Sequence, residues 1–317
     1  MISNKKNDLN LFSSFLKMTL QIPKNFNLGY ACLNETLREQ GIFTSRTLRL
    51  ATVREKGVNY IKMLIVHNLR DLFRILKWNV QNKIYLYRMS SETFPFITHP
   101  EVDYNLDFVD DMLKEIGRYA RLNKVRLSFH PSQWNVLNSI QPHVITNAIK
   151  DLGHHADVMD RMGLDKNSII VIHGGTRGRG EQLRDNIKLL PKNIRDRLVL
   201  ENCENCYTVE DLLPICEELD VGLVIDFHHN QINQSSKDVS EYFDRIFAIW
   251  NKRGIKPKFH LSNSEPGVLD TDNITRRRKH SDYITFFHAP LLTITRPIDI
   301  MLECKKKELA LQRIRGF

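Results

Sequence analysis

The chain has 317 residues, of which 42% are hydrophobic, so it can bury the core of one large domain. Lys and Arg number 46 against 37 Asp and Glu, which gives a formal net charge of +9 and a sequence pI near 9.3. This excess favours a polyanionic partner, nucleic acid before an anionic membrane. No apolar run approaches the ~18 residues that a membrane span requires, so we expect no membrane segment and no membrane partner.

The five cysteines indicate a reducing compartment. Their number is odd and they follow no regular framework, which is typical of an intracellular protein. We expect the cytoplasm if the source is prokaryotic, and the nucleus or a viral factory if it is eukaryotic or viral. Cys203 and Cys206 form a CxxC pair, but no second pair or nearby His-x-x-x-His accompanies it, so a zinc knuckle is not expected.

From the N-terminus onward, residues 1–25 are predicted to be an extension and 26–317 a single domain. The segment 9–22 is mildly amphipathic but lacks a small-residue cleavage site, so we do not expect a signal peptide. Met18 lies where translation could also start. Beyond it, short apolar runs alternate with helix-like segments. The expected strands are 28–32, 84–89, 125–129, 168–172, 198–200, 223–225, 258–261 and 298–302. The expected helices include 60–79, 107–121, 144–162, 182–190, 209–218 and 240–252.

This alternation predicts the α/β class and a single (β/α)8 TIM barrel with a short N-terminal extension. An open doubly wound sheet is the alternative, although no glycine-rich phosphate fingerprint follows the first strand.

Metal-binding residue types recur where the predicted strands end. His99 lies in the connection after the second strand, and strands three to eight end in or are followed by His130, His173, Glu201, Asp226 with His228 and His229, His260, and Glu303. In a barrel the carboxyl ends of the strands converge on one face. A single strand-end histidine or carboxylate is usually structural, but six successive cases indicate a shared site. Because clustered carboxylates repel one another, divalent cations are expected there, and a mixed imidazole–carboxylate set suits Zn²⁺ or Mn²⁺.

Motifs spread in order over residues 28–308 resemble those of the UV damage endonuclease family. They are LGYACLN (28–34), RLATV (49–53), LKWN (76–79), YRMSSETFPFITH (87–99), SFHPSQWNVLNS (128–139), IHGG (172–175), LEN (200–202), EDLLPIC (210–216), DFHH (226–229), PKFHLS (257–262), HSDYI (280–284) and IMLECKKKE (300–308). The resemblance implies a TIM barrel similar to that of apurinic endonuclease IV. It also implies metal-dependent cleavage of DNA 5′ to ultraviolet photoproducts, which leaves a 3′-hydroxyl and a 5′-phosphate.

Carried over by position, the resemblance implies a cluster of two to three Mn²⁺ or Zn²⁺ ions. The implied ligands are His130, His173, Glu201, Asp226, His229, His260, His280 and Glu303, and the implied catalytic residues are Glu201, His99, Lys258 and His260. Glu201 would bridge two ions, and His228 would support the site from outside. In the family the lysine that matches Lys258 can be carboxylated into a metal ligand; the alternative is an ordinary cation that faces a carboxylate or phosphate.

Gln133 and Trp134 match a glutamine–aromatic pair that the family inserts into the duplex while the damaged dinucleotide swings out. The family usually has Tyr or Phe in place of Trp134 and Gly in place of Ser132. Tyr30 and Asn34 match first-loop residues near the lesion pocket, although a packed barrel tyrosine is the alternative for Tyr30.

The run Arg276, Arg277, Arg278 and Lys279 directly precedes His280. A charge run is often a solvated face, but next to a metal ligand it is expected to contact DNA phosphates, with strong salt dependence. The expected partner is therefore damaged double-stranded DNA. We expect no organic cofactor, and a monomer by default. Two alternatives stay open: a metal-dependent sugar isomerase or epimerase on the same barrel, and a non-catalytic DNA-damage-binding protein.

Overall fold

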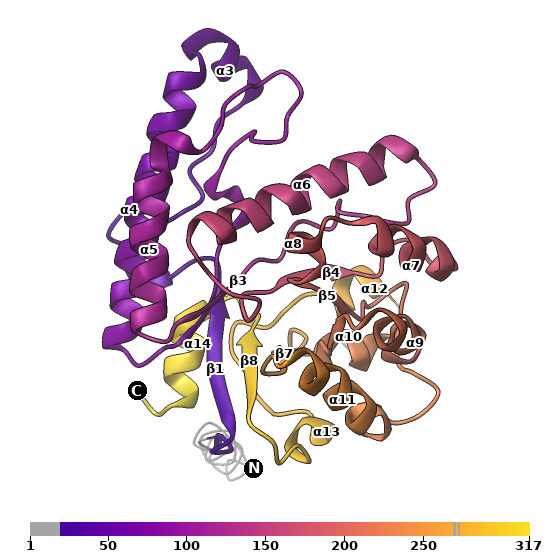
Figure 1. Cartoon of the computed structure of the whole chain (residues 1–317). Helices are drawn as coiled ribbons and strands as arrows, with labels where there is room; N and C mark the ends of the chain where they lie inside the picture. Colours follow the sequence, from indigo (N-terminus) through magenta and orange to yellow (C-terminus); the bar gives the residue numbers. More distant parts are fainter. Residues whose placement is uncertain (1–19, 269–270, 272) are drawn as a thin grey trace, which may run out of the picture.

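The computed structural model describes residues 20–268, 271 and 273–317 (Figure 1). Most of the predicted extension, including Met18, lies outside the described residues. Eight strands follow in chain order: β1 (Phe26–Ala31), β2 (Leu86–Arg88), β3 (Arg126–Ser128), β4 (Ile170–His173), β5 (Leu198–Glu201), β6 (Gly222–Val224), β7 (Lys258–Leu261) and β8 (Ile298–Leu302). All eight predicted strands are therefore present, β7 and β8 at the predicted bounds.

The strands close into a parallel ring. One sheet has the order β3-β2-β1-β8-β7 and the other β4-β5-β6. Single bridges between Phe129 and Ile170 and between Asp226 and His260 join the two sheets. Because β1 pairs with both β2 and β8, the first and last strands are neighbours, and the open doubly wound alternative is wrong. The fold is the predicted (β/α)8 barrel.

Helices connect the strands and surround the ring (Figure 1). The α-helices are α2 (Glu35–Arg38), α3 (Leu50–Lys56), α4 (Val58–Gln81), α5 (Asp110–Leu122), α6 (Pro142–Arg161), α7 (Gly180–Leu189), α8 (Lys192–Arg195), α9 (Val209–Leu219), α10 (Phe227–Ile232), α11 (Phe243–Arg253), α12 (Ile274–Arg277), α13 (Ala289–Leu292) and α14 (Lys307–Ile314). Short 3₁₀ helices are η1 (Ser91–Thr93), η2 (Asp107–Val109) and η3 (Val239–Tyr242). Each of the six predicted helices is present, although two of them begin with a 3₁₀ turn, η2 before α5 and η3 before α11.

Close packing between the layers depends on small residues at two points. Gly117 on α5 faces the loop after α6 so closely that a Cβ there would lie 1.8 Å from the carbonyl oxygen of Met162. Gly222 on β6 makes room for Trp250 of α11, and the indole donates a hydrogen bond to the carbonyl oxygen of Leu223 at 3.0 Å. A side chain at either glycine would force the helix away from its neighbour.

A buried ion-pair network connects residues at the N-terminal ends of several strands. Asp299 on β8 is 2% exposed and accepts from Arg126 of β3 at 2.8 Å, from Lys256 at 2.5 Å and from Asn27 of β1 at 2.8 Å. Burial raises the pKa of Asp299, but the two cations outweigh burial and the pKa is lowered. The network joins three strands at one end of the barrel, which fixes their register.

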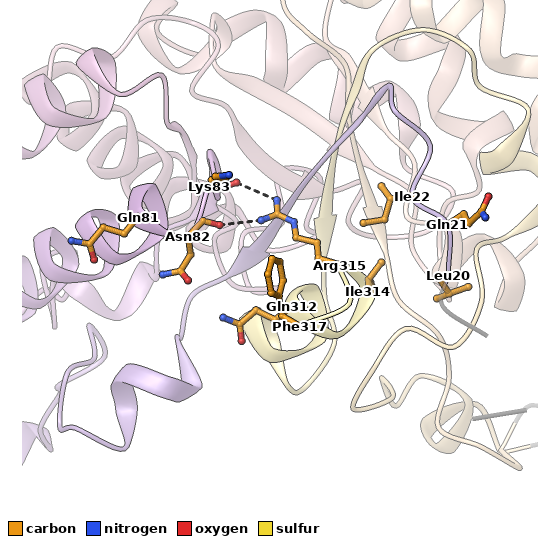
Figure 2. A pocket seen from close by; sticks show the side chains of 10 residues that line it. All are labelled: Leu20, Gln21, Ile22, Gln81, Asn82, Lys83, Gln312, Ile314, Arg315 and Phe317. Atoms are coloured by element: carbon orange, nitrogen blue, oxygen red, sulfur yellow. Dashed lines mark hydrogen bonds between the residues drawn. The ribbon is translucent and has the colours of Figure 1, made fainter. Parts of the chain in front are cut away.

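A cavity of about 980 Å³ lies at this same end (Figure 2). Its lining includes Leu20 and Ile22 before β1, and Phe317 at the C-terminus. Figure 2 shows Arg315 reaching back to the chain before β2, where it donates to the carbonyl oxygens of Asn82 and Lys83 at 3.1 and 3.2 Å. The cavity is therefore separated by the barrel from the carboxyl ends of the strands, where the predicted metal ligands lie.

Candidate metal centre

The register of the strands brings the predicted ligands together. His173 ends β4 directly opposite Glu201, which ends β5. Asp226 follows β6 and is bridged to His260 in β7. Because these pairs come from neighbouring strands that end at the same face, residues far apart in sequence share one site.

Glu201 lies at the centre of this site and is fully buried. Its Oε2 is 2.7 Å from His130 Nε2 and 3.3 Å from His173 Nε2. Its Oε1 is 2.9 Å from His260 Nδ1 and 3.5 Å from His229 Nδ1. Imidazoles therefore face both carboxylate oxygens, so each oxygen has the neighbours that a separate metal site needs.

Three groups of side chains have possible ligand atoms within 4.8 Å of one another. They are His130–Glu201–His260, His173–Glu201–His229 and Asp226–His260–Glu303. The groups share Glu201 and His260, so they form one continuous cluster. Seven of the eight predicted metal ligands belong to it.

Asp226 also shapes the local backbone. Its Oδ1 caps α10 by accepting the backbone N–H groups of His228 at 2.7 Å and His229 at 2.9 Å. The cap leaves Asp226 Oδ2 buried with no hydrogen-bond partner among the described residues, and His260 Nε2 is in the same condition. Buried polar atoms without a partner are destabilising, and a divalent cation would satisfy both. The donor set therefore fits a divalent metal.

The electrostatics of the cluster lead to the same conclusion. Burial raises the pKa of Glu201, but His260, His130 and His173 outweigh burial and hold it well below its usual range. Burial lowers the pKa of His229, whereas Asp226, Glu201 and other carboxylates raise it to about 9. The buried carboxylate of Glu201 thus stays ionised, and an ionised buried carboxylate requires positive charge nearby.

Lys258 lies two residues before His260 on β7, so both side chains project to the same side of the strand. It is fully buried and donates to Ser128 Oγ at 2.8 Å. Burial lowers its pKa to about 7, and Arg88 and Arg126 contribute in the same direction. Much of the Lys258 amine is therefore uncharged at neutral pH.

His280 lies beside this cluster but does not belong to the three groups of possible ligands found among the described residues. Its Nδ1 is 2.7 Å from Ser262 Oγ, and its ring packs edge-on against His228 with centroids 5.0 Å apart. His228 Nε2 in turn contacts Ser264 Oγ at 2.8 Å and the carbonyl oxygen of Arg277 at 3.1 Å. His228 therefore supports the segment that carries His280.

His99 is also separate from the three groups. Its Nδ1 accepts the backbone N–H of Glu101 at 3.2 Å, and its ring packs against Phe96. Its described contacts are local to the loop after β2.

Gln133 and Trp134 occupy a turn that follows His130 by three and four residues. Both side chains are exposed, and that of Trp134 is 77% exposed. The turn is held without the indole, since Asn135 donates to the carbonyl oxygen of Ser132 at 3.2 Å and to Asp151 at 2.9 Å. A large aromatic side chain is thus presented to solvent next to the cluster.

The lesion contacts expected of Tyr30 and Asn34 do not agree with their positions, because both side chains are 0% exposed. Tyr30 Oη donates to Asn79 Oδ1 at 2.6 Å and accepts from Asn34 Nδ2 at 2.9 Å. Asn34 Oδ1 caps α2 by accepting from the backbone of Leu37 at 2.8 Å. In this conformation the two residues support the barrel wall and cannot touch DNA.

The basic segment 276–279 runs from α12 to His280. Arg276, Arg278 and Lys279 are exposed, and Arg277 is half-buried. Arg278 turns inward and pairs with Glu204 at 2.5 Å. The segment therefore offers positive charge at the rim of the cluster.

Two charged residues at the site were not predicted from the sequence. Arg88 ends β2 and pairs with Glu303, and Glu204 lies between Arg278 and His229. The rule that selected the predicted ligands, a polar residue at each strand end, also selects Arg88 if cationic residues are included. Glu204 lies in a loop, and no pattern in the sequence indicates where its side chain points.

Among the described residues, no helix has the length and apolar character needed to cross a membrane. The five cysteines are unpaired. Cys203 Sγ accepts backbone N–H groups from Cys206 and Tyr207 at 3.0 and 3.2 Å.

Comparison with solved structures places the fold. The structure described as SacUVDE superposes with a TM-score of 0.80 at 28% identity, and the match covers 92% of this chain and 97% of that chain. Endonuclease IV from Thermus thermophilus has a TM-score of 0.51 at 14% identity, with 78% and 92% covered, which supports the shared fold alone.

Proteins that are related in sequence point to the same family as the structure with the TM-score of 0.80. A protein of Acanthamoeba polyphaga mimivirus named as a UV-damage endonuclease is 40% identical over 89% of this chain and 88% of its own length. The UV-damage endonuclease of Schizosaccharomyces pombe is 37% identical over 91% of this chain, which spans only 50% of that longer protein. The UV DNA damage endonuclease of Bacillus cereus strain G9842 is 35% identical over 79% of this chain and 80% of its own length. The family model for UV-endonuclease UvdE matches residues 26–315, and the chain therefore belongs to the UV-endonuclease UvdE family.

Proposed function

We propose that this protein is a DNA repair endonuclease that hydrolyses the phosphodiester bond 5′ to a UV photoproduct in a metal-dependent reaction. The proposed substrates are cyclobutane pyrimidine dimers and 6-4 photoproducts, and the products carry a 3′-hydroxyl and a 5′-phosphate. The observation that carries the proposal is the buried carboxylate of Glu201 with imidazoles at both oxygens, in a chain whose relatives are named UV-damage endonucleases.

The cluster would hold two to three ions, Mn²⁺ or Zn²⁺, and needs no organic cofactor. The proposed ligands are His130, His173, Glu201, Asp226, His229, His260 and Glu303, with His280 as an eighth. When bound, such ions neutralise phosphate charge and lower the pKa of a bound water. Glu201 would serve two ions at once, since its two oxygens face different imidazoles.

Two neighbours of the ligands have proposed roles of their own. Lys258 is buried beside His260 with a pKa of about 7, so its uncharged amine can react with carbon dioxide to form a carbamate and release a proton. The carboxylated side chain would be an anionic ligand. His99 keeps its proposed place in the active site as a contact to substrate, because its loop follows the end of β2.

Selection of damaged DNA is proposed to depend on Gln133 and Trp134. Photoproducts stack and pair poorly, so their extrusion requires less free energy than extrusion of intact pyrimidines. The exposed indole of Trp134 can replace the stacking that the duplex loses. The basic segment would bind phosphates without reading sequence.

The test is an incision assay on an end-labelled duplex that carries one defined pyrimidine dimer, with Mn²⁺ or with chelator. We expect one nick directly 5′ to the dimer with Mn²⁺, and none on undamaged duplex, with chelator, or with Glu201→Gln. Glu217→Gln, which changes a carboxylate paired with Arg245 at 2.6 Å on the outer helices, is the matched control and should nick as the unmodified protein does. Binding of damaged duplex without incision at any metal concentration would favour the damage-binding alternative and contradict the proposal.

A further inference from the structure

Asn138 joins the loop that carries Trp134 to the loop that follows β4. Its side chain is fully buried, although it lies between β3 and α6, outside any helix or strand. The amide oxygen Oδ1 accepts the backbone N–H of Thr176 at 2.8 Å. The two hydrogens of the amide nitrogen Nδ2 are shared among four oxygens at 3.0–3.2 Å, namely the carbonyl oxygens of Gly174, Thr176 and Arg179, and Tyr207 Oη. One side chain therefore holds the whole loop 174–179.

Tyr207 contributes to the same arrangement from the loop after β5. Its hydroxyl group donates to the carbonyl oxygen of Thr176 at 2.8 Å and accepts the backbone N–H of Arg179 at 3.0 Å. The side chain is 5% exposed, so water competes little for these bonds. Asn138 and Tyr207, here called the clasp, thus connect the loops that follow three successive strands, β3, β4 and β5.

The two glycines that follow His173 make room for the clasp. A Cβ at Gly174 would lie 2.7 Å from the ring of Tyr207. A Cβ at Gly175, whose φ is +81°, would lie 2.2 Å from Asn138 Oδ1. Because His173 directly precedes both glycines, the clasp is built next to a proposed metal ligand.

The clasp lies where strand pairing gives the loops little support. β3 and β4 belong to different sheets, and the single bridge between Phe129 and Ile170 joins them. The loops that follow these two strands are therefore held together by side chains. Asn138 supplies one such contact, and Asn186 of α7 supplies another by donating to the carbonyl oxygen of Leu137 at 2.6 Å.

Trp134 lies four residues before Asn138. The chain between them is turned, since the N–H of Val136 donates to the carbonyl oxygen of Trp134 at 3.0 Å. Asn135 anchors the other side of the turn through its bond to Asp151 of α6. An indole that is 77% exposed has little packing of its own, so its position depends on these two anchors. Of the two, the clasp connects that position to the end of β4 and so to the metal centre.

We propose that Asn138 is a positioning residue that acts through Gln133 and Trp134, with Tyr207 as its partner: the clasp holds the exposed turn at a fixed place relative to the metal centre. The inference rests on the proposed function, because it assumes that this turn enters a damaged duplex. Groups that are ordered before binding lose less conformational freedom on binding, so the interaction is stronger. Binding of damaged duplex should therefore gain from the clasp. Undamaged duplex, which is held through its phosphates, should gain nothing.

The first test is competition binding in chelator between a fluorescent duplex with one pyrimidine dimer and an unlabelled undamaged duplex. Asn138→Ala should lower the ratio of damaged to undamaged affinity by about twofold or more, the lower limit for residues coupled through one network. Asn25→Ala is the matched control and should keep the full ratio. This asparagine donates to the carbonyl oxygens of Ile294 and Arg296 at 2.8 and 2.9 Å, at the opposite end of the barrel.

A double-mutant cycle separates positioning from a general weakening of the fold. In a background with Gln133→Ala and Trp134→Ala, the clasp has no inserted side chains left to hold, so Asn138→Ala should lower the ratio no further. A loss of the same size in both backgrounds would overturn the inference. A destabilised variant still gives a valid ratio, because both duplexes compete for the same folded protein.

Tyr207→Phe tests the clasp even if Asn138→Ala does not fold. It keeps the ring that packs against Gly174 and removes the hydroxyl group, which releases the carbonyl oxygen of Thr176 and the N–H of Arg179. We expect a smaller loss of the ratio in the same direction, and again no loss in the background without the inserted side chains. The full ratio in Tyr207→Phe would overturn the inference.

The outcomes separate the inference from the proposed function. Incision 5′ to the dimer by the unmodified protein, together with the full ratio in Asn138→Ala and Tyr207→Phe, would overturn the inference alone. An unmodified protein that binds the two duplexes equally and nicks neither with Mn²⁺ would overturn both.

Discussion

Replacement of Trp134 by Ala should reduce the preference for damaged DNA without affecting the fold. The indole is 77% exposed, and the turn is held by Asn135 through its bonds to Ser132 and Asp151. The free energy of unfolding should therefore change by no more than about 0.5 kcal/mol, as for other surface substitutions. Stacking of a base on an aromatic ring contributes about 1–3 kcal/mol. At about 1.4 kcal/mol per tenfold change in affinity, the loss corresponds to a reduction of about 5–150-fold.

The assay is competition binding in chelator, so that no incision occurs, with a fluorescent duplex that carries one pyrimidine dimer and an unlabelled undamaged duplex. Trp134→Ala should weaken binding of the damaged duplex and leave the undamaged duplex nearly unchanged. Trp134→Phe should retain most of the preference because it keeps an aromatic plane. Phe317→Ala is the matched control, since this aromatic is 91% exposed at the opposite end of the barrel. If Trp134→Ala kept the full ratio of damaged to undamaged affinity, the stacking argument would be refuted.

Three further predictions concern the metal centre and the scaffold. Glu201→Gln should weaken Mn²⁺ binding by more than about 100-fold, measured by titration, because a ligand matters more than an outer partner, whose loss weakens binding by about 10–100-fold. Asp299→Asn should lower the free energy of unfolding by about 3–5 kcal/mol, measured in urea, because it leaves Arg126 and Lys256 without their buried partner. Folding lowers the pKa of Asp299, so its contribution to the free energy of unfolding is present above about pH 4 and is lost as pH falls through the folded pKa. The free energy of unfolding of Asp299→Asn should therefore fall less steeply with decreasing pH than that of the unmodified protein. Gly117→Ala should destabilise by at least about 1–3 kcal/mol, because the new Cβ would meet the backbone of Met162.

Each of these predictions has an outcome that would contradict it, and the glycine substitution also has a matched control. Gly153→Ala on α6 is matched to Gly117→Ala, because the nearest atom to its Cβ is 3.8 Å away, and it should be neutral or slightly stabilising. Equal effects at the two glycines would contradict the packing argument. An unchanged pH profile in Asp299→Asn would show that other groups set the acid limit, and full Mn²⁺ affinity in Glu201→Gln would remove Glu201 from the ligand set.

The strands and the convergence of the ligands could be predicted because both follow from periodicity. A parallel barrel requires every strand to end at one face, so His173 and Glu201 could be assigned to a common site although 27 residues separate them in the sequence. The 3₁₀ turns before α5 and α11 could not be separated from the helices, because three or four residues are too few to distinguish a period of 3.0 from 3.6.

The site was less predictable where the path of a loop determines which way a side chain points. Tyr30 was placed near a lesion by its position in the chain, yet its hydroxyl is fully engaged by Asn79 and Asn34. Glu204 was not predicted, because its contact with Arg278 joins segments 74 positions apart. Such contacts depend on the path of two irregular segments, which residue spacing does not encode.

The two junctions between the sheets, here called seams, affect how the barrel unfolds. Between β3 and β4, and again between β6 and β7, a single bridge replaces a ladder of hydrogen bonds. His173 and Glu201 belong to the three-stranded sheet, whereas His130 and His260 lie on the five-stranded side. Any ion shared by Glu201 and His130 therefore spans a seam and holds together two halves that the backbone joins only weakly. Amide hydrogen exchange should then be slowed by Mn²⁺ along β3 and β4 more than along the fully laddered pair β1 and β8, so that ions bound at this site would also determine where the barrel first unfolds.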